Sequence, residues 1–275
     1  MWNDLPHSGT TVASATVGST KSDVNHMRSV SVALAVLEAV AERQPVGVSE
    51  LARAMELPKS TMQRMLLTLG ELGWIRAGAE EPTRWSLTSK AMSIGSRHRG
   101  DDEIRRVALP AMHALSAATG ETVHLSVLEE RRVVLIEKIE SIHPVRTHTT
   151  IGNSAPLHTT ASGKAILAAM PQAQARALLR APLEALTERT QTDVPTLLEE
   201  LGRAREDGYA VTVGTRHPEI AAVGAAVLGA SGLPVASLSL SLPVHRFPEQ
   251  SWPDLGEQVA RAAAECSREL GWRPA

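Results

Sequence analysis

A short polar set between positions 59 and 68 holds the side chains best suited to recognising a nucleic acid. The set consists of Lys59, Ser60, Thr61, Gln63, Arg64 and Thr68. At helical spacing it lies opposite an apolar stripe, which consists of Met62, Leu66, Leu69 and Leu72. Arginine pairs well with guanine and glutamine with adenine, whereas serine, threonine and lysine at a helix start suit phosphates. The spacing therefore predicts a helix that presents its polar edge to a DNA groove.

A solvated helix in a generic three-helix unit is the alternative interpretation of this segment. Solvated helices usually carry more Glu and Lys on their outer face, whereas the acidic residue of this segment, Glu71, lies at its far end. Further along the chain, Arg84 is expected to reach the adjacent minor groove or the DNA backbone. A surface arginine beside Trp85 is the competing interpretation of that residue.

The elements that must position this helix can be read from the residues before it. A first helix is expected from about residue 30 to a turn at residues 44–47. Its expected buried face consists of Val30, Leu34, Leu37 and Ala41. Ser49 is expected to cap a short second helix, because its hydroxyl can accept hydrogen bonds from free amides of the first turn. Since Leu57-Pro58 stops that helix just before Lys59, the order predicts a helix-turn-helix.

Two short strand-like stretches follow, residues 74–76 and 84–87, and polar residues join them. They predict a hairpin wing whose core contains Trp74 and Trp85. The expected domain boundaries are a flexible tail at 1–25, a DNA-binding domain at 26–88, a linker at 89–100 that starts as a short helix, and a second domain at 101–275.

From residue 101 the pattern becomes that of an α+β domain. A helix ends at Gly120, and apolar residues then alternate with polar ones around residues 123–127 and from residue 133. Further strands are expected at 145–150, 209–213, 220–228 and 234–242, and helices at 160–170, 172–181, 195–207 and 253–270. The expected architecture is an antiparallel sheet with helices packed on it.

The second domain also contains a pattern that indicates a ligand site. Ser239 and Ser241 are two residues apart on an expected strand, so their hydroxyls share one face and the leucines around them share the other. A buried polar row needs water or a ligand, although a solvent-facing serine ladder is the alternative. Residues 159–162 precede a helix, whose free amides suit a carboxylate. Plain helix capping is the alternative for that loop.

Composition limits the possible classes of protein. A chain of 275 residues is long enough for two cores. Residues 21–100 carry 11 Lys and Arg against 8 Asp and Glu, whereas residues 101–275 carry 17 Lys and Arg against 21 Asp and Glu. This difference in charge is expected for a DNA-binding domain joined to a separate domain. The single cysteine, Cys266, excludes an intramolecular disulfide and a cysteine-based zinc site. No signal peptide or membrane-spanning run is evident, so a cytoplasmic protein is expected.

Motifs of catalysis and metal binding are missing from the sequence. Gly163-Lys164 is followed by Ala165, where a phosphate loop needs Ser or Thr, and no Gly-x-Ser-x-Gly elbow of a hydrolase occurs. The spacing of His143, His148 and His158 matches no common metal site. Neither an enzyme nor a cofactor is expected.

Several segments together resemble the IclR family of bacterial transcription regulators. They are Leu57 to Gly73, the wing, Gly152 to Ala168 and Gly208-Tyr209-Ala210, and Pro156–Ala165 is the most specific of them. The resemblance covers about residues 30–270. It implies a winged helix-turn-helix joined by a linker helix to a GAF-like effector domain. It also implies dimers or tetramers on palindromic operators, with small organic acids or aromatic compounds as frequent effectors.

The family resemblance also implies where an effector binds. By position it assigns Thr160, Ala161, Thr212, Ala222, Ser239 and Ser241 to the effector pocket. Some relatives that bind small keto-acids have an acidic residue in place of Thr212 and a thiol in place of Ala222, and many have Gly in place of Leu242. These departures leave the identity of the effector open.

The sequence therefore predicts a DNA-binding transcription regulator whose affinity for a double-stranded operator is controlled by a small-molecule effector. A homodimer or homotetramer without membrane contact is expected. The alternative is a small-molecule-binding or hydrolytic domain whose helix-turn-helix serves only protein contacts. A gel shift would separate the two, because phosphate contacts make DNA binding strongly dependent on salt.

Overall fold

The computed structural model describes residues 27–79, 82–95 and 101–273. These residues form two compact units, one before and one after residues 96–100. The expected flexible tail at 1–25 and the C-terminal part of the expected linker lie outside the described residues. Among the helices described, none is long and apolar enough to cross a membrane.

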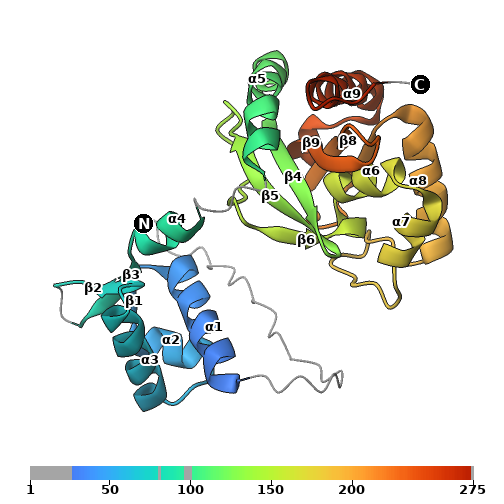
Figure 1. Ribbon diagram of the computed structural model, residues 1–275. Coiled ribbons are helices and arrows are strands. Elements are labelled where there is room, and N and C mark those ends of the chain that lie inside the picture. The colour runs from blue at the N-terminus through green and yellow to red at the C-terminus, as the bar shows by residue number, and fades with distance from the viewer. Residues whose placement is uncertain (1–26, 80–81, 96–100, 274–275) are drawn as a thin grey trace, which may run out of the picture. The chain divides into compact units, whose positions relative to one another are not determined.

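The N-terminal unit consists of a helical group and a small antiparallel sheet (Figure 1). Its described helices are α1 Arg28–Arg43, α2 Val48–Ala54, α3 Lys59–Glu71 and α4 Lys90–Gly95. Its described strands are β1 Val46–Gly47, β2 Ile75–Ala77 and β3 Arg84–Leu87, in the order β1-β3-β2. The predicted helix-turn-helix and wing are confirmed, and α4 is the short helix expected after the wing.

The buried face of α1 differs from the predicted one. Val36, Ala39 and Val40 are buried, whereas Val30 and Leu34 are 50% and 54% exposed. Ala41 is also exposed, and Leu37 is partly buried. The prediction of Val30, Leu34 and Ala41 as core residues is wrong, because α1 carries more than one apolar stripe and spacing alone does not decide which of them packs inward.

Two local expectations beside α3 are also wrong. Leu72 is 57% exposed, because α3 has already ended and the chain turns through Gly73, whose φ is 73°. Ser49 does not cap α2, because the helix begins at Val48 and the cap position is Gly47. A glycine with extended backbone at this cap leaves Ser49 inside the first helical turn.

The C-terminal unit is built on a six-stranded antiparallel sheet with the order β6-β5-β4-β9-β8-β7. The strands are β4 Thr122–Glu129, β5 Arg132–Ile139, β6 Ser154–Pro156, β7 Ala210–Val213, β8 Ile220–Leu228 and β9 Pro234–Pro243. The α-helices are α5 Asp102–Thr119, α6 Ala161–Ala169, α7 Gln172–Leu178, α8 Val194–Asp207 and α9 Trp252–Glu269. Short 3-10 helices are η1 Leu157–Thr159, η2 Val244–Arg246 and η3 Glu249–Ser251. The predicted α+β architecture is confirmed.

One predicted strand is wrong. Residues 145–150 form an irregular segment, and the edge of the sheet beside β5 is occupied by β6 instead. The segment is nevertheless fastened to the sheet, because the Thr147 hydroxyl donates a 3.4 Å hydrogen bond to the carbonyl oxygen of Ser241. Alternating residue types in this segment do not produce a ladder, because the backbone of β9 at Ser241 is already paired with β4 and β8.

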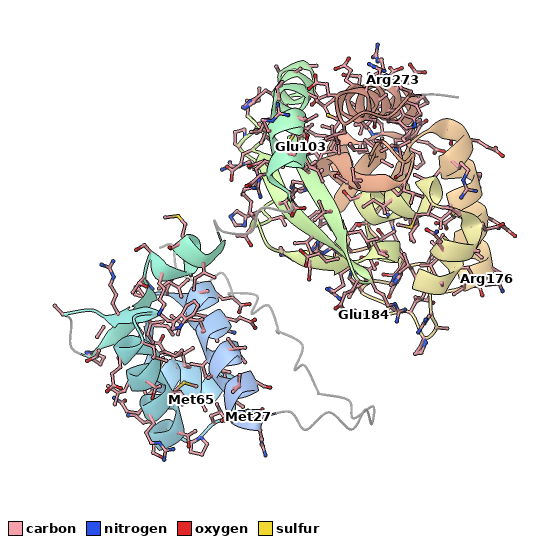
Figure 2. The ribbon with its side chains drawn as sticks, in the orientation of Figure 1. Met27, Met65, Glu103, Arg176, Glu184 and Arg273 are labelled. Atoms are coloured by element: carbon pink, nitrogen blue, oxygen red, sulfur yellow. The ribbon has the colours of Figure 1, made fainter. Side chains whose placement is uncertain are left out.

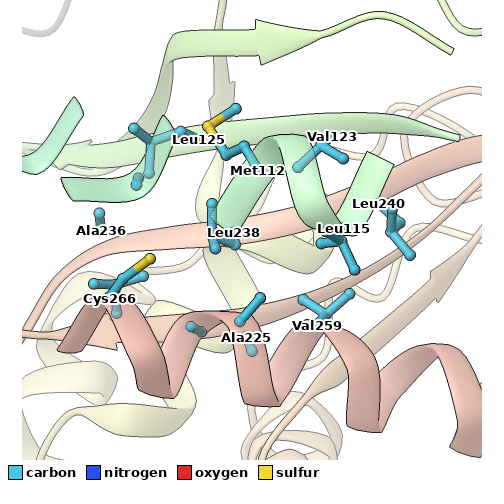
Figure 3. Packing of buried hydrophobic residues seen from close by; sticks show 14 of the residues in the cluster. Met112, Leu115, Val123, Leu125, Ala225, Ala236, Leu238, Leu240, Val259 and Cys266 are labelled. Carbon is cyan, nitrogen blue, oxygen red and sulfur yellow. The ribbon is translucent and has the colours of Figure 1, made fainter. Parts of the chain in front are cut away.

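Helices cover both faces of this sheet (Figure 1). On one face, α5 and α9 pack over a core in which Met112, Leu125 and Leu238 are fully buried (Figure 3). On the other face, α6 packs against β8 and β9. Because side chains alternate along a strand, the leucines of β9 face α5 and α9, and its serines face α6. This arrangement places a row of polar side chains in the interior.

Candidate functional site

The polar set at positions 59–68 lies on the outer side of α3. Lys59, Ser60, Gln63, Arg64 and Thr68 are exposed, and Thr61 is half-buried. On the inner side, Met62 and Leu66 are fully buried and Leu69 is 7% exposed. Among the described residues, no hydrogen bond or ion pair occupies the side chains of Lys59, Gln63 and Arg64. These side chains are therefore available to an external partner.

Arg84, at the start of β3, is bound within the protein. Its Nη1 donates a 2.9 Å hydrogen bond to the carbonyl oxygen of Pro45, and its Nη2 lies 3.1 Å from Oε1 of Glu50. These contacts tie the wing to the segment between α1 and α2 and to α2 itself. Arg84 would have to exchange these partners in order to contact DNA.

A groove lies between α3 and the wing. Its volume is about 440 Å³, and its lining includes Ser49, Glu50, Lys59, Gln63, Leu67 and Thr83. The lining joins two members of the polar set to the start of α2. The buried indole of Trp85 also borders the groove and fixes the wing against the helices.

The six residues assigned to an effector pocket all line one cavity of the C-terminal unit. They are Thr160, Ala161, Thr212, Ala222, Ser239 and Ser241. The cavity volume is about 90 Å³. The pairing of strands explains this convergence, because Thr212 lies opposite Ala222 and Ala222 lies opposite Ser241. Residues opposite each other in a sheet share a face.

The start of α6 closes one side of the cavity, and two glycines allow it to pack closely against η1 and β8. A Cβ on Gly163 would collide with the backbone of Leu157, and a Cβ on Gly224 would lie 3.0 Å from the carbonyl carbon of Ala161. The amide of Gly163 donates a 3.0 Å hydrogen bond to Oγ1 of Thr160, which caps the helix. The hydroxyl of Ser162 donates to Oγ of Ser239 at 2.9 Å and joins α6 to β9.

Several residues of the cavity wall were missed by the sequence analysis. They include His124, Ser126, Asn153, Thr215 and Arg216. A signal for the first two was present, because they occupy the polar positions of the alternating pattern on β4. His124 lies opposite Ser239 in the sheet. Asn153 and Arg216 lie in irregular segments, where no spacing pattern indicates which way a side chain points.

Electrostatics distinguish one end of this cavity. Burial, together with the charges of Lys138 and Arg216, lowers the pKa of His124 to about 4, so its imidazole is neutral at pH 7. Burial lowers the pKa of Arg216 as well, and the nearby charge of Arg132 adds to this effect. Among the described lining residues there is no Asp or Glu. The cavity therefore favours a ligand that carries negative charge.

Lys164 and His158 of this unit form hydrogen bonds within the protein. Lys164 is 5% exposed, and its Nζ donates a 2.6 Å hydrogen bond to Oε2 of Glu200, which joins α6 to α8. Nε2 of His158 lies 2.8 Å from the carbonyl oxygen of Glu184, a residue labelled in Figure 2. Over residues 27–79, 82–95 and 101–273, no three His, Cys, Asp or Glu side chains gather where they could hold a metal ion.

Comparison with known proteins agrees with this division of the chain. The model of the IclR helix-turn-helix domain matches residues 29–78, and that of the bacterial transcriptional regulator IclR C-terminal domain matches residues 99–268. The HTH-type transcriptional regulator KdgR of Escherichia coli is 32% identical over 238 residues, which cover 86% of this chain and 90% of KdgR. Other curated relatives are named as transcriptional repressors, and the relatives are regulators rather than enzymes.

Solved structures give the same result. The IclR protein of Thermotoga maritima has a TM-score of 0.73 and 29% identity, covering 90% of this chain and all of that one. An IclR homologue from Microbacterium hydrocarbonoxydans, solved in complex with 4-hydroxybenzoate, has a TM-score of 0.71, covers 88% of this chain and 98% of that one, and is 23% identical, which supports the fold alone. The chain therefore belongs to the IclR family of bacterial transcriptional regulators, with a helix-turn-helix domain and an effector-binding domain.

Proposed function

We propose that this regulator reads a double-stranded DNA operator with the outer edge of α3, and that a small organic acid or aromatic catabolite in the C-terminal cavity controls its operator affinity. The observation that carries the proposal is the outward polar set on α3. Its long side chains are exposed and have no partner among the described residues, while the opposite stripe is buried. A helix held in this way can enter the major groove with its polar edge first.

The polar set divides into two roles. Gln63 and Arg64 are suited to base edges, because each can form two hydrogen bonds to one base. Lys59, Ser60, Thr61 and Thr68 are suited to phosphates, which set the register of the helix on the duplex. Arg84 is a phosphate contact only if it exchanges its bond to Glu50 for one to the DNA.

The effector is bound by the six converging residues of the cavity and those beside them. Support comes from the internal position of Ser239 and Ser241, which are 3% and 7% exposed. A polar wall with no acidic residue in its described lining suits an acid. Because the Microbacterium relative was solved with 4-hydroxybenzoate, that compound is a rational first probe.

The regulator acts as a homodimer or homotetramer in the cytoplasm. Met27, Val30 and Leu34 are 69%, 50% and 54% exposed on the outer side of α1, and Met27 is labelled in Figure 2. Met27 is the residue just before α1, and Val30 and Leu34 lie one turn apart on the helix. Exposed apolar side chains grouped in this way suit a contact with a second copy. An effector that binds one arrangement of the subunits more tightly than another changes the spacing of their helix-turn-helix domains. This change in spacing alters the affinity for the operator.

A gel shift with the DNA upstream of its own gene tests the proposal. The full-length chain should bind this fragment, and raising the salt from about 50 to 200 mM should weaken binding more than tenfold, because cationic contacts release counterions. An effector should change the affinity at constant salt. Failure to bind the fragment, with and without candidate acids, would favour the alternative in which the helix-turn-helix contacts only protein.

A further inference from the structure

Arg216 is a charged side chain in the cavity wall without a charged partner. It lies in the turn between β7 and β8, is half-buried, and lines the cavity. Its Nη2 donates a 3.0 Å hydrogen bond to Oδ1 of Asn153, which is a neutral acceptor. Within the described part of the chain, no carboxylate forms an ion pair with it. A half-buried guanidinium normally has such a partner, since its desolvation is otherwise uncompensated.

His124 supplies a second unpaired group in the same wall. Its Nε2 is fully buried and, among the described residues, has no hydrogen-bond partner. Because this atom has no accessible surface, the rest of the imidazole ring is what lines the cavity. His124 lies close enough to Arg216 for the charge of the guanidinium to affect the imidazole. Both side chains line the cavity.

The start of α6, which borders the same cavity, is already largely paired. Oγ1 of Thr160 accepts from Gly163, and the carbonyl oxygen of Thr160 accepts from Lys164. The hydroxyl of Ser162 is bonded to Ser239. This end offers helix amides but no formal positive charge, because among the described lining residues Arg216 is the only Lys or Arg. A neutral oxygen is sufficient there.

We propose that the effector is a carboxylic acid whose carboxylate binds Arg216, while a neutral polar group points toward Ser241 and the start of α6. This inference rests on the proposed effector cavity. It reverses the orientation expected from the sequence, in which the carboxylate was placed at the helix start. The guanidinium gains the counter-ion that it lacks.

Titration calorimetry with the full-length protein tests this orientation through matched acids and amides. The pairs are benzoate with benzamide, 4-hydroxybenzoate with 4-hydroxybenzamide, and pyruvate with pyruvamide. Each amide keeps the shape of its acid but lacks the charge. The tightest acid should bind the wild-type protein about tenfold to a hundredfold more tightly than its amide, because a charge-assisted hydrogen bond is lost.

The variant Arg216→Gln should abolish this preference for the acid. Arg216→Lys keeps the charge without the fork of donors and should keep part of the preference. Arg132→Gln is the matched control: Arg132 lies near Arg216 and bonds Ser154, yet it does not line the cavity. It should keep the full preference. Thermal unfolding without ligand shows whether each variant is folded. If Arg216→Gln is unfolded, Arg216→Lys replaces it in the comparison.

Three results would overturn the inference. They are an equal preference for the acid in wild type and the two Arg216 variants, a loss of preference in Arg132→Gln equal to that in Arg216→Gln, and no binding of any acid by the wild type at up to about 20 mM. Since the readout needs no DNA, its outcome is separate from that of the regulator proposal. Binding of acids through Arg216 without any effect on DNA affinity would leave the orientation intact and contradict only the regulatory role.

Discussion

The two units use polar side chains in opposite ways. On α3, the polar set points outward and its long side chains have no partners among the described residues, whereas the apolar stripe beneath it is buried. In the C-terminal unit, polar side chains point into the interior, and some of them bond one another, as Ser162 of α6 and Ser239 of β9 do. An exposed unpaired set suits a partner as large as a duplex, and an enclosed one suits a ligand that fills a small cavity. Burial therefore determines which class of partner each set can recognise.

The largest expected effect comes from a substitution in the inward-facing region, at Gly163, where α6 packs closely against Leu157. Gly163→Ala should destabilise the C-terminal unit by about 3 kcal/mol, because its methyl group would overlap the backbone of Leu157. Urea unfolding measures this loss. Gly202→Ala in α8 is the control, since a Cβ there meets nothing within 4 Å, and it should be neutral or slightly stabilising. Equal stability of the two variants would contradict the packing described for α6.

The next effect concerns the outward-facing region. Arg64→Ala should weaken operator binding by about 1–3 kcal/mol without changing the unfolding temperature, because the side chain is exposed and makes no internal contact. Fluorescence anisotropy with labelled operator DNA measures the affinity. Arg43→Ala removes an arginine that is paired with Glu42 in the same unit and should change the affinity less. Unchanged operator affinity in Arg64→Ala would show that Arg64 does not contact bases.

A smaller effect is expected at the ion pair between α6 and α8. Glu200→Gln leaves the buried ammonium of Lys164 without its counter-ion and should lower stability by about 1–2 kcal/mol, a value reduced by the partial exposure of Glu200. Thermal unfolding at pH 7 measures the change. Glu199→Gln, on the neighbouring position of the same helix, is the control. If both variants unfold at the wild-type temperature, the pair does not stabilise the position of α6.

The smallest effect at neutral pH belongs to His124. Since its pKa falls from 6.5 to about 4 in the folded protein, the unfolded chain binds a proton first as the pH drops. Stability should therefore decrease between about pH 6.5 and pH 4, and His124→Gln should decrease less over this range. His113→Gln, on the exposed side of α5, serves as the comparison. Parallel stability curves for wild type and His124→Gln would show that the imidazole is not buried as described.

The outward-facing region was predictable because helical spacing alone places its residues. Met62, Leu66 and Leu69 are buried, as the spacing of α3 predicts. The same reasoning was wrong for α1, where Val36 and Val40 pack inward instead of Val30 and Leu34. A helix with two apolar stripes offers two possible core faces, and only tertiary packing selects one.

The inward-facing region was predictable only in part. The alternation of Ser239 and Ser241 with leucines, and the family resemblance, placed six residues that do line one cavity. The sequence did not indicate that Arg216 reaches the same cavity, because the turn between β7 and β8 has no periodicity. The strand expected at 145–150 was wrong for a related reason, since alternation does not form a ladder where the neighbouring strand is already paired on both sides.

Equilibrium binding to two labelled duplexes tests the central claim most directly. One duplex carries the chain's own upstream sequence, and the other carries the same bases in scrambled order. If α3 reads bases, the full-length protein should prefer its own sequence by about a thousandfold at physiological salt, and Arg64→Ala should reduce that preference. Equal affinity for both duplexes would contradict the claim that the outer edge of α3 recognises sequence.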